Sequence, residues 1–186
     1  MNPAILFVVG ASGAGKTAAV QSLAQQTLPG VGCYYFDSIG VPSAEVMAQK
    51  WGGGEQWQEE MTTRWIERLA TNADRVQIAV LEGQTRPAFI RSALQRLGVR
   101  HARIVLLDCR QSTRHARLAG PRAQPELSNE RTDTWAAYLR GQADALALPV
   151  VDTTSRSIAE VAILLREQVD LLRELFTSMT WSPDHG

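Results

Sequence analysis

The sequence predicts an α/β fold in which a parallel sheet carries helices on both faces. Short apolar runs of strand length recur along the chain, and each is followed by a segment of helix length. The runs are nearly continuous in Val, Ile, Leu and aromatic residues, which is typical of strands buried on both faces of a parallel sheet. Strands that alternate with helices indicate a layered architecture with right-handed crossovers.

Each expected element follows from this alternation. Strands are predicted at Ala4–Val9, Cys33–Phe36, Val76–Leu81, Arg103–Asp108 and Leu148–Val151. Helices are predicted at Lys16–Thr27, Ala44–Lys50, Gln56–Asn72, Pro87–Leu97, Gln111–Ala119 and Asn129–Ala147. Ser157 and Glu160 fit a capping box that starts a last helix, whose core-facing stripe comprises Ile158, Ala162, Leu165, Val169, Leu172 and Phe176. The tail Thr177–Gly186 is expected to be frayed.

Length and composition predict a single globular domain over residues 1–186. Hydrophobic residues make up 45% of the chain and charged residues 20%, and no repeat or low-complexity linker divides it. The formal net charge of zero gives no electrostatic case for nucleic acid or an anionic membrane. No apolar run approaches the roughly 18–20 residues that span a bilayer, and no signal-peptide features are present, so a cytoplasmic protein is expected. Cys33 and Cys109 are expected to be free, buried thiols.

The strongest motif is a phosphate-binding loop. Its residues match the Walker A pattern: Gly10, Ala11, Ser12, Gly13, Ala14, Gly15, Lys16 and Thr17, with Ala18 beginning the helix. Glycines let the backbone approach phosphates closely, and the loop amides and helix N-terminus attract anions. Lys16 is expected to reach the outer phosphates and Thr17 to bind Mg²⁺. The loop follows a buried strand and opens a helix, which is the context that this motif requires. We therefore expect ATP or a close relative as ligand.

With this loop near its start and a single-domain layout, the chain resembles the small kinases of the nucleoside-monophosphate, shikimate and gluconate kinase superfamily. The resemblance covers nearly the whole chain, but only the phosphate loop is highly specific. It implies a three-layer P-loop fold with a five-stranded parallel sheet in the order 2-3-1-4-5. It also implies a substrate-binding helical segment at about 41–72 and a short lid at about 119–128.

The resemblance also assigns roles to residues at strand ends. Asp37 ends the second strand, where ligands of open α/β sheets bind, and is expected to orient or deprotonate the acceptor. A turn residue that satisfies nearby backbone N–H groups is the alternative. Glu82, Gly83 and Arg86 follow the layout of the family's acceptor loop, with glutamate in place of aspartate. Glu82 is expected to hold a Mg²⁺-bound water or a substrate hydroxyl, and Arg86 a substrate phosphate or carboxylate. The alternative is a strand-end acid paired locally with an arginine.

A group of arginines follows the fourth strand and resembles the family's lid. Arg110, Arg114 and Arg117 share one helix face by their spacing, and Arg122 follows them. The resemblance implies that Arg114, Arg117 and Arg122 act catalytically by stabilising charge on the transferring phosphoryl group; a solvated helix face is the alternative. Thr153 and Thr154 leave the fifth strand, where related kinases contact the adenine base.

Together these assignments predict an ATP- and Mg²⁺-dependent phosphotransferase that acts on a small-molecule acceptor. No nucleic-acid or membrane partner is expected. The protein is expected to be a monomer or a homodimer. An NTP hydrolase and a nucleotide-binding regulatory module are the alternatives. The acceptor, the choice between ATP and GTP, and the oligomeric state stay open. So does the question whether Trp51, Trp57 and Trp65 bind substrate or only pack.

Overall fold

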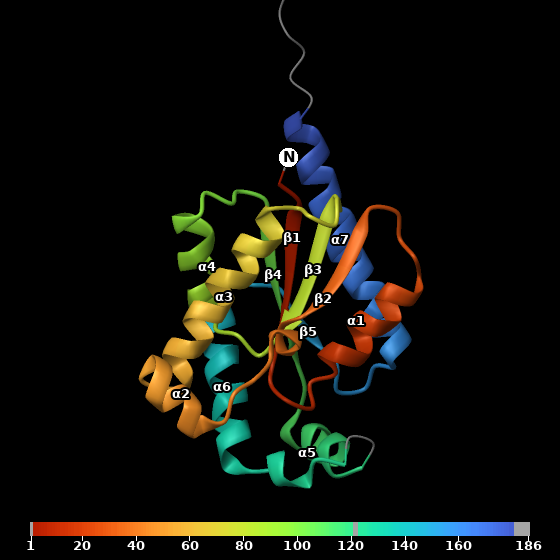
Figure 1. Cartoon of the computed structure of the whole chain (residues 1–186). Coiled ribbons are helices and arrows are strands. Elements are labelled where there is room, and N and C mark those ends of the chain that lie inside the picture. The colour runs from red at the N-terminus through yellow and green to blue at the C-terminus, as the bar shows by residue number, and fades with distance from the viewer. Residues whose placement is uncertain (1, 121–122, 181–186) are drawn as a thin grey trace, which may run out of the picture.

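The computed structural model describes residues 2–120 and 123–180 and has three layers (Figure 1). Within them, a parallel sheet holds five strands in the order β2-β3-β1-β4-β5, which confirms the expected 2-3-1-4-5 arrangement. The strands are β1 (Ala4–Val9), β2 (Val31–Tyr35), β3 (Ile78–Gly83), β4 (Ala102–Asp108) and β5 (Val150–Asp152).

Helices cover both faces of the sheet, as the alternating pattern predicts. One face is covered by α1 (Lys16–Gln25) and α7 (Ile158–Thr180). The other is covered by α3 (Gly54–Ala70), α4 (Pro87–Arg96) and α6 (Glu130–Ala145). The helix α2 (Ala44–Trp51) adjoins α3, and α5 (Gln111–Ala119) lies beyond the carboxyl ends of the strands (Figure 1). Two 3₁₀ helices complete the elements, η1 (Phe36–Ile39) and η2 (Pro125–Leu127). No helix in the described ranges is long and apolar enough to cross a bilayer.

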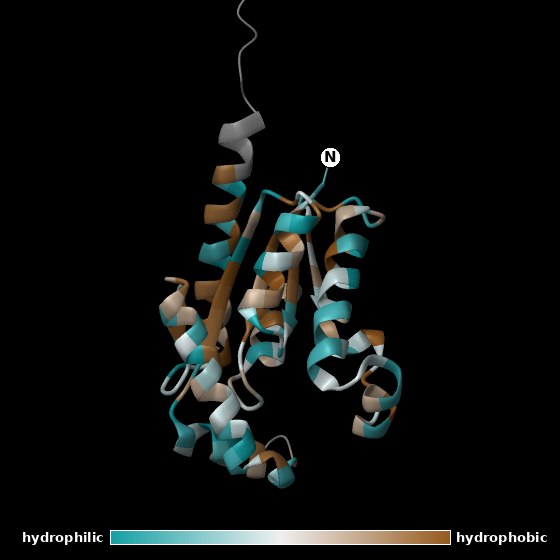
Figure 2. Cartoon of the chain, turned by 90° about the vertical axis from the view of Figure 1, so that its left-hand side faces the viewer, coloured by the Kyte–Doolittle hydropathy of each residue, from teal (hydrophilic) through white to brown (hydrophobic). Residues whose placement is uncertain are grey.

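The central strand β1 joins the two halves of the core. Its six residues are all buried, and they alternate between the two faces because successive side chains of a strand point in opposite directions. Ile5, Phe7 and Val9 pack toward α3, α4 and α6. Ala4, Leu6 and Val8 pack toward α1 and α7. In Figure 2 the strands are largely brown, whereas the helices around them carry most of the teal.

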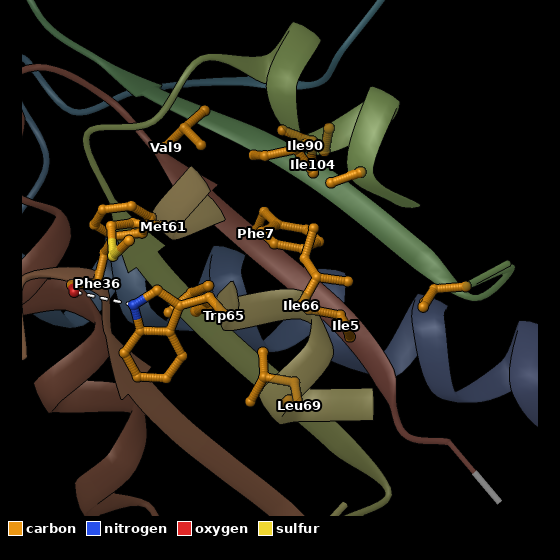
Figure 3. Packing of buried hydrophobic residues seen from close by; sticks show 14 of the residues in the cluster. Ile5, Phe7, Val9, Phe36, Met61, Trp65, Ile66, Leu69, Ile90 and Ile104 are labelled. Carbon is orange, nitrogen blue, oxygen red and sulfur yellow. Dashed lines mark hydrogen bonds between the residues drawn. The ribbon is translucent and has the colours of Figure 1, made fainter. Parts of the chain in front are cut away.

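The tryptophan-rich segment packs against the core. Trp57, Met61, Trp65 and Leu69 form the buried stripe of α3, and Trp51 is half-buried against the same cluster. The Trp65 indole donates a hydrogen bond of 3.1 Å from Nε1 to the carbonyl oxygen of Phe36, which begins η1 directly after β2 (Figure 3). This bond satisfies a polar group that would otherwise be buried without a partner. The segment thus supports the sheet and holds one strand end in place.

Several element boundaries differ from the predicted ones. β2 begins at Val31 and ends at Tyr35, and the chain then turns into η1, so Asp37 lies in a 3₁₀ turn and does not end a strand. β3 runs from Ile78 to Gly83, so Glu82 belongs to the strand.

The last helix also differs from its prediction. The capping box is present, with the Glu160 carboxylate accepting from the backbone N–H of Ser157 at 2.7 Å. α7 continues to Thr180, so the expected fraying from Thr177 is wrong as far as Thr180, and the rest of the tail lies outside the described residues. Ile158 is 55% exposed and does not belong to the buried stripe that contains Ala162, Leu165, Val169 and Leu172. The side chain of Phe176 lies outside the described part of the structure.

Candidate active site

The phosphate loop joins β1 to α1 in a conformation that its glycines make possible. Gly13 has φ +80° and Gly15 φ +91°, in the left-handed region that residues with a Cβ rarely adopt. A Cβ on Gly13 would also lie 2.8 Å from Cγ of Arg114. A Cβ on Gly10 would lie 2.4 Å from the carbonyl oxygen of Leu107 in β4. The pattern of glycines is therefore a requirement of the local packing as well as of phosphate access.

Lys16 lies at the start of α1 and folds back over the loop. Its side chain is buried, and Nζ donates a hydrogen bond of 3.0 Å to the carbonyl oxygen of Ala11. The ammonium group is thus held at the loop before any phosphate arrives. Together with the backbone N–H groups at the start of α1, it makes the loop a positive site for anions, as the Walker A pattern predicts.

Thr17 and Glu82, the two residues predicted to bind a metal, lie within hydrogen-bond distance of each other. The Thr17 hydroxyl donates a hydrogen bond of 3.2 Å from Oγ1 to Oε1 of Glu82, which is only 7% exposed. Glu82 reaches this place because β3 pairs with β1 in register, with Val8 opposite Glu82. A hydroxyl and a carboxylate oxygen fit Mg²⁺, which takes few protein ligands and keeps water and phosphate oxygens as the rest. No group of three or more His, Cys, Asp or Glu in the described residues could hold a metal ion by itself.

Asp37 lies beyond the carboxyl end of β2 and is exposed. The pairing of Tyr35 with Glu82 places η1 next to the end of β3. Gly83 permits this proximity, because a Cβ on Gly83 would lie 2.5 Å from Cβ of Phe36. The two acidic residues predicted from the sequence therefore lie on neighbouring strand ends, one buried at the phosphate loop and the other open to solvent.

Arg86 is already surrounded by side chains at the other predicted acceptor position. Its guanidinium donates to Oε1 of Gln58 at 2.7 Å and to Oε2 of Glu55 at 3.1 Å. The guanidinium carbon also lies 5.2 Å from the ring centroid of Phe89 and 5.0 Å from that of Trp135. These contacts tie α4 to α3 and α6. Arg86 thus pairs with Glu55 of α3, and not with the strand-end acid Glu82 of the alternative reading.

Arg114 and Arg117, two of the arginines predicted to belong to a lid, have different partners. Arg114 is buried at 5% exposure and pairs with Asp133 of α6, with Nη2 2.8 Å from Oδ1. Burial raises the pKa of Asp133, but hydrogen bonds from Arg114, Gln111 and His115 outweigh it and hold that pKa below the ordinary 3.8. The Arg114 guanidinium thus joins α5 to α6. The aliphatic part of the same side chain lies against Gly13 of the phosphate loop. His115, which had no predicted role, is part of the same cluster.

Arg117 instead lies against the phosphate loop. Its guanidinium donates to the carbonyl oxygen of Gly13 at 3.3 Å, and to Oγ1 and the carbonyl oxygen of Thr153 at 2.9 and 2.6 Å. The buried Thr153 hydroxyl in turn donates to the carbonyl oxygen of Ala14 at 2.9 Å. Thr154 accepts a hydrogen bond from the backbone N–H of Arg110 and so supports the start of α5. Arg122 lies outside the described residues.

A pocket of about 440 Å³ opens beside these residues, on the side of the loop that faces β5 and α7. It is lined by glycines of the phosphate loop, by two arginines and by apolar residues of α1 and α7. Its lining comprises Gly13, Gly15, Thr17, Ala18, Ala19, Gln21, Arg117, Thr153, Arg156, Ile158 and Val161. The volume is that of a small-molecule site. The sequence predicted Ala18, Arg117 and Thr153 as site residues but not Gln21 and Arg156, which belong to no motif. Ile158 was not predicted either, because the pattern of α7 assigned that residue to the core.

No family model matches this chain, and no curated protein does. Solved structures are similar in fold. A gluconokinase from Sinorhizobium meliloti 1021 superposes with a TM-score of 0.62 at 18% identity, covering 96% of both chains. A shikimate kinase from Acinetobacter baumannii, in complex with shikimate, gives 0.60 at 17% identity over 90% of this chain and 93% of its own. A thymidylate kinase from Candida albicans gives 0.58 at 11% identity over 92% and 93%. The expected likeness to the small P-loop kinases is thereby confirmed: the chain has their fold.

Proposed function

We propose that this chain is an ATP- and Mg²⁺-dependent phosphotransferase that acts on a small-molecule acceptor. The observation that carries the proposal is a pocket on one side of the phosphate loop and an exposed carboxylate on the other. The pocket lined by Arg117 and Thr153 lies on the β5 side, and the exposed Asp37 lies beyond β2 on the other. A hydrolase requires only the pocket and a water molecule, whereas a kinase also requires a group that positions an acceptor. The fold neighbours named as kinases support the same assignment.

In this proposal the pocket holds the base and sugar of ATP, and Gly10–Thr17 holds its phosphates. Lys16 is placed at the loop to neutralise the outer phosphates, and Arg117 adds positive charge next to Gly13. Thr17 and Glu82 are the residues that would hold Mg²⁺, which when bound would neutralise charge on the β- and γ-phosphates.

The transfer itself needs little covalent work from the protein. An acceptor hydroxyl positioned by Asp37 attacks the γ-phosphorus, and a new P–O bond forms. The bond from the γ-phosphorus to the bridging oxygen of ADP breaks, so ADP leaves with that electron pair. The hydroxyl proton passes to the carboxylate of Asp37 and from there to solvent, which the exposed position of Asp37 allows.

The test is transfer of labelled phosphate from γ-labelled ATP with Mg²⁺ to a panel of sugars, sugar acids and nucleoside monophosphates. We expect an acceptor-dependent product, a loss of at least about a hundredfold in kcat for Asp37→Asn, and unchanged ATP affinity. Asp170→Asn, a half-buried aspartate that pairs with Arg173 within α7, is the matched control and should keep full activity. Acceptor-independent release of phosphate that survives Asp37→Asn would show a hydrolase, and binding of ATP without turnover a regulatory module.

A further inference from the structure

A hydrogen bond connects the phosphate loop to the acceptor side of the site. The side-chain amide of Gln84 donates from Nε2 to the hydroxyl of Ser12, over 2.9 Å. Gln84 directly follows β3, and Ser12 lies in the middle of the phosphate loop that follows β1. Both residues are half-buried. The bond is not needed to hold β1 and β3 together, because their backbones already pair as far as Val9 and Gly83.

The backbone of the segment that carries Gln84 is held from α3. Gln58 donates from Nε2 to the carbonyl oxygen of Gln84 at 2.6 Å. The hydroxyls of Thr62 and Thr85 share a buried hydrogen bond of 2.7 Å. Gln58 also accepts from Arg86, so one α3 side chain holds this segment at two points. The loop after β3 is therefore fixed in place, while the terminal amide of Gln84 lies against a hydroxyl that can exchange partners.

The sheet order fixes which part of a nucleotide would meet this amide. The base-side pocket lies toward β5 and α7, and β3 lies on the other side of β1. A triphosphate that extends from that pocket along the loop places its last phosphate at the end nearest β3. Lys16 and the pair formed by Thr17 and Glu82 lie along the same path. The amide at Ser12 is therefore at the γ-phosphate end of the loop.

We propose that Gln84 binds the γ-phosphate and so distinguishes ATP from ADP. The amide N–H that donates to Ser12 in the free protein donates to a γ-phosphate oxygen when ATP is bound. This inference rests on the proposed function to the extent that the loop must bind ATP. It adds a residue that the Walker A motif does not contain, and it links occupancy of the γ-position to Gln58 and Arg86 on the acceptor side.

Two variants separate phosphate binding from structural support. Gln84→Ala removes the amide. Gln84→Glu keeps the size and can still accept a hydrogen bond from the Ser12 hydroxyl, but it places a negative charge beside the phosphate. Calorimetry would compare the affinities of ADP and of a non-hydrolysable ATP analogue. We expect the ATP analogue to bind about tenfold more weakly or worse to both variants, as for loss of a hydrogen bond to a charged group, and ADP affinity to change less than about twofold. Gln95→Ala, an exposed glutamine on α4, should change neither affinity.

Equal losses of ADP and analogue affinity would overturn the inference, because they would show a loop-supporting role. Wild-type analogue affinity in Gln84→Glu would overturn it as well. The same data keep the two proposals apart. Selective loss of analogue binding in a protein that transfers phosphate to no acceptor would support Gln84 and refute the kinase. Failure of the wild-type chain to bind either nucleotide would refute both.

Discussion

Removal of the Asp133 carboxylate is the perturbation that most directly tests how α5 is held. This carboxylate accepts hydrogen bonds from three side chains of α5, namely Arg114 at 2.8 Å, His115 at 3.0 Å and Gln111 at 2.6 Å. Arg114 is almost fully buried, so it cannot turn to water when its partner is lost. Asp133→Ala therefore leaves a positive charge inside the protein without its counter-ion.

The expected cost follows from this burial. Breaking a buried ion pair by removing one partner costs about 3–5 kcal/mol. The Asp133 side chain is 18% exposed, so water partly screens the pair, and we expect a somewhat smaller cost of about 2–4 kcal/mol. At roughly 2–4 °C per kcal/mol for a chain of this size, the melting temperature should fall by about 5–15 °C.

Urea unfolding followed by circular dichroism measures this free energy directly. Asp144→Ala is the matched control, because Asp144 lies on the same helix and pairs with Arg140, but its side chain is 61% exposed. The control should change stability by less than about 1 kcal/mol. Equal, small losses for Asp133→Ala and Asp144→Ala would refute the reasoning, since they would show that burial of Arg114 adds nothing to the pair.

Three further predictions follow from the same structure. Gly13→Ala should abolish nucleotide binding and lower the melting temperature, because its Cβ would collide with Arg114. Gly141→Ala in α6, where a Cβ meets nothing within 4 Å, should instead stabilise the protein by about 0.5–1 kcal/mol. Calorimetric scans with and without ATP test both variants. Lys16→Ala should eliminate ATP binding while leaving the urea midpoint within about 0.5 M of wild type, which fluorescence titration and urea unfolding would check. The folded pKa of Asp133 lies below its unfolded value, so its contribution is complete above about pH 4 and is lost at lower pH. The stability difference between wild type and Asp133→Ala should therefore shrink as the pH falls below about 4, and a difference that stays constant there would contradict this.

The sheet and the phosphate loop could be predicted because their signals are local. β1 is a continuous apolar run, and the glycine pattern from Gly10 to Thr17 follows from backbone geometry that few other residues permit. The strand order came from the resemblance to small kinases and not from any pattern in the strands. Strand ends were less accurate, as at β2, where the half-buried residues carry a weaker signal than the fully buried ones of β1.

Residues that act through distant partners could not be found in this way. Spacing placed Arg114 and Arg117 on one face of α5, but it could not show that Asp133 of the next helix takes one guanidinium and Thr153 the other. Gln84 is an uncharged loop residue outside any motif, and only its distance from Ser12 reveals it. Trp65 was part of a visible stripe, yet its hydrogen bond to the Phe36 carbonyl depends on the chain folding back from β2 onto α3.

The position of β1 in the sheet has a consequence for synthesis of the chain. β1 leaves the ribosome before both of its partners, β3, which begins at Ile78, and β4, which begins at Ala102. Until those segments emerge, both edges of β1 stay unpaired. Its six residues are uncharged and apolar, which is a composition typical of segments that aggregate. Such long-range pairing also slows folding. The strand that presents the phosphate loop therefore stays without either strand partner until β3 has been synthesised.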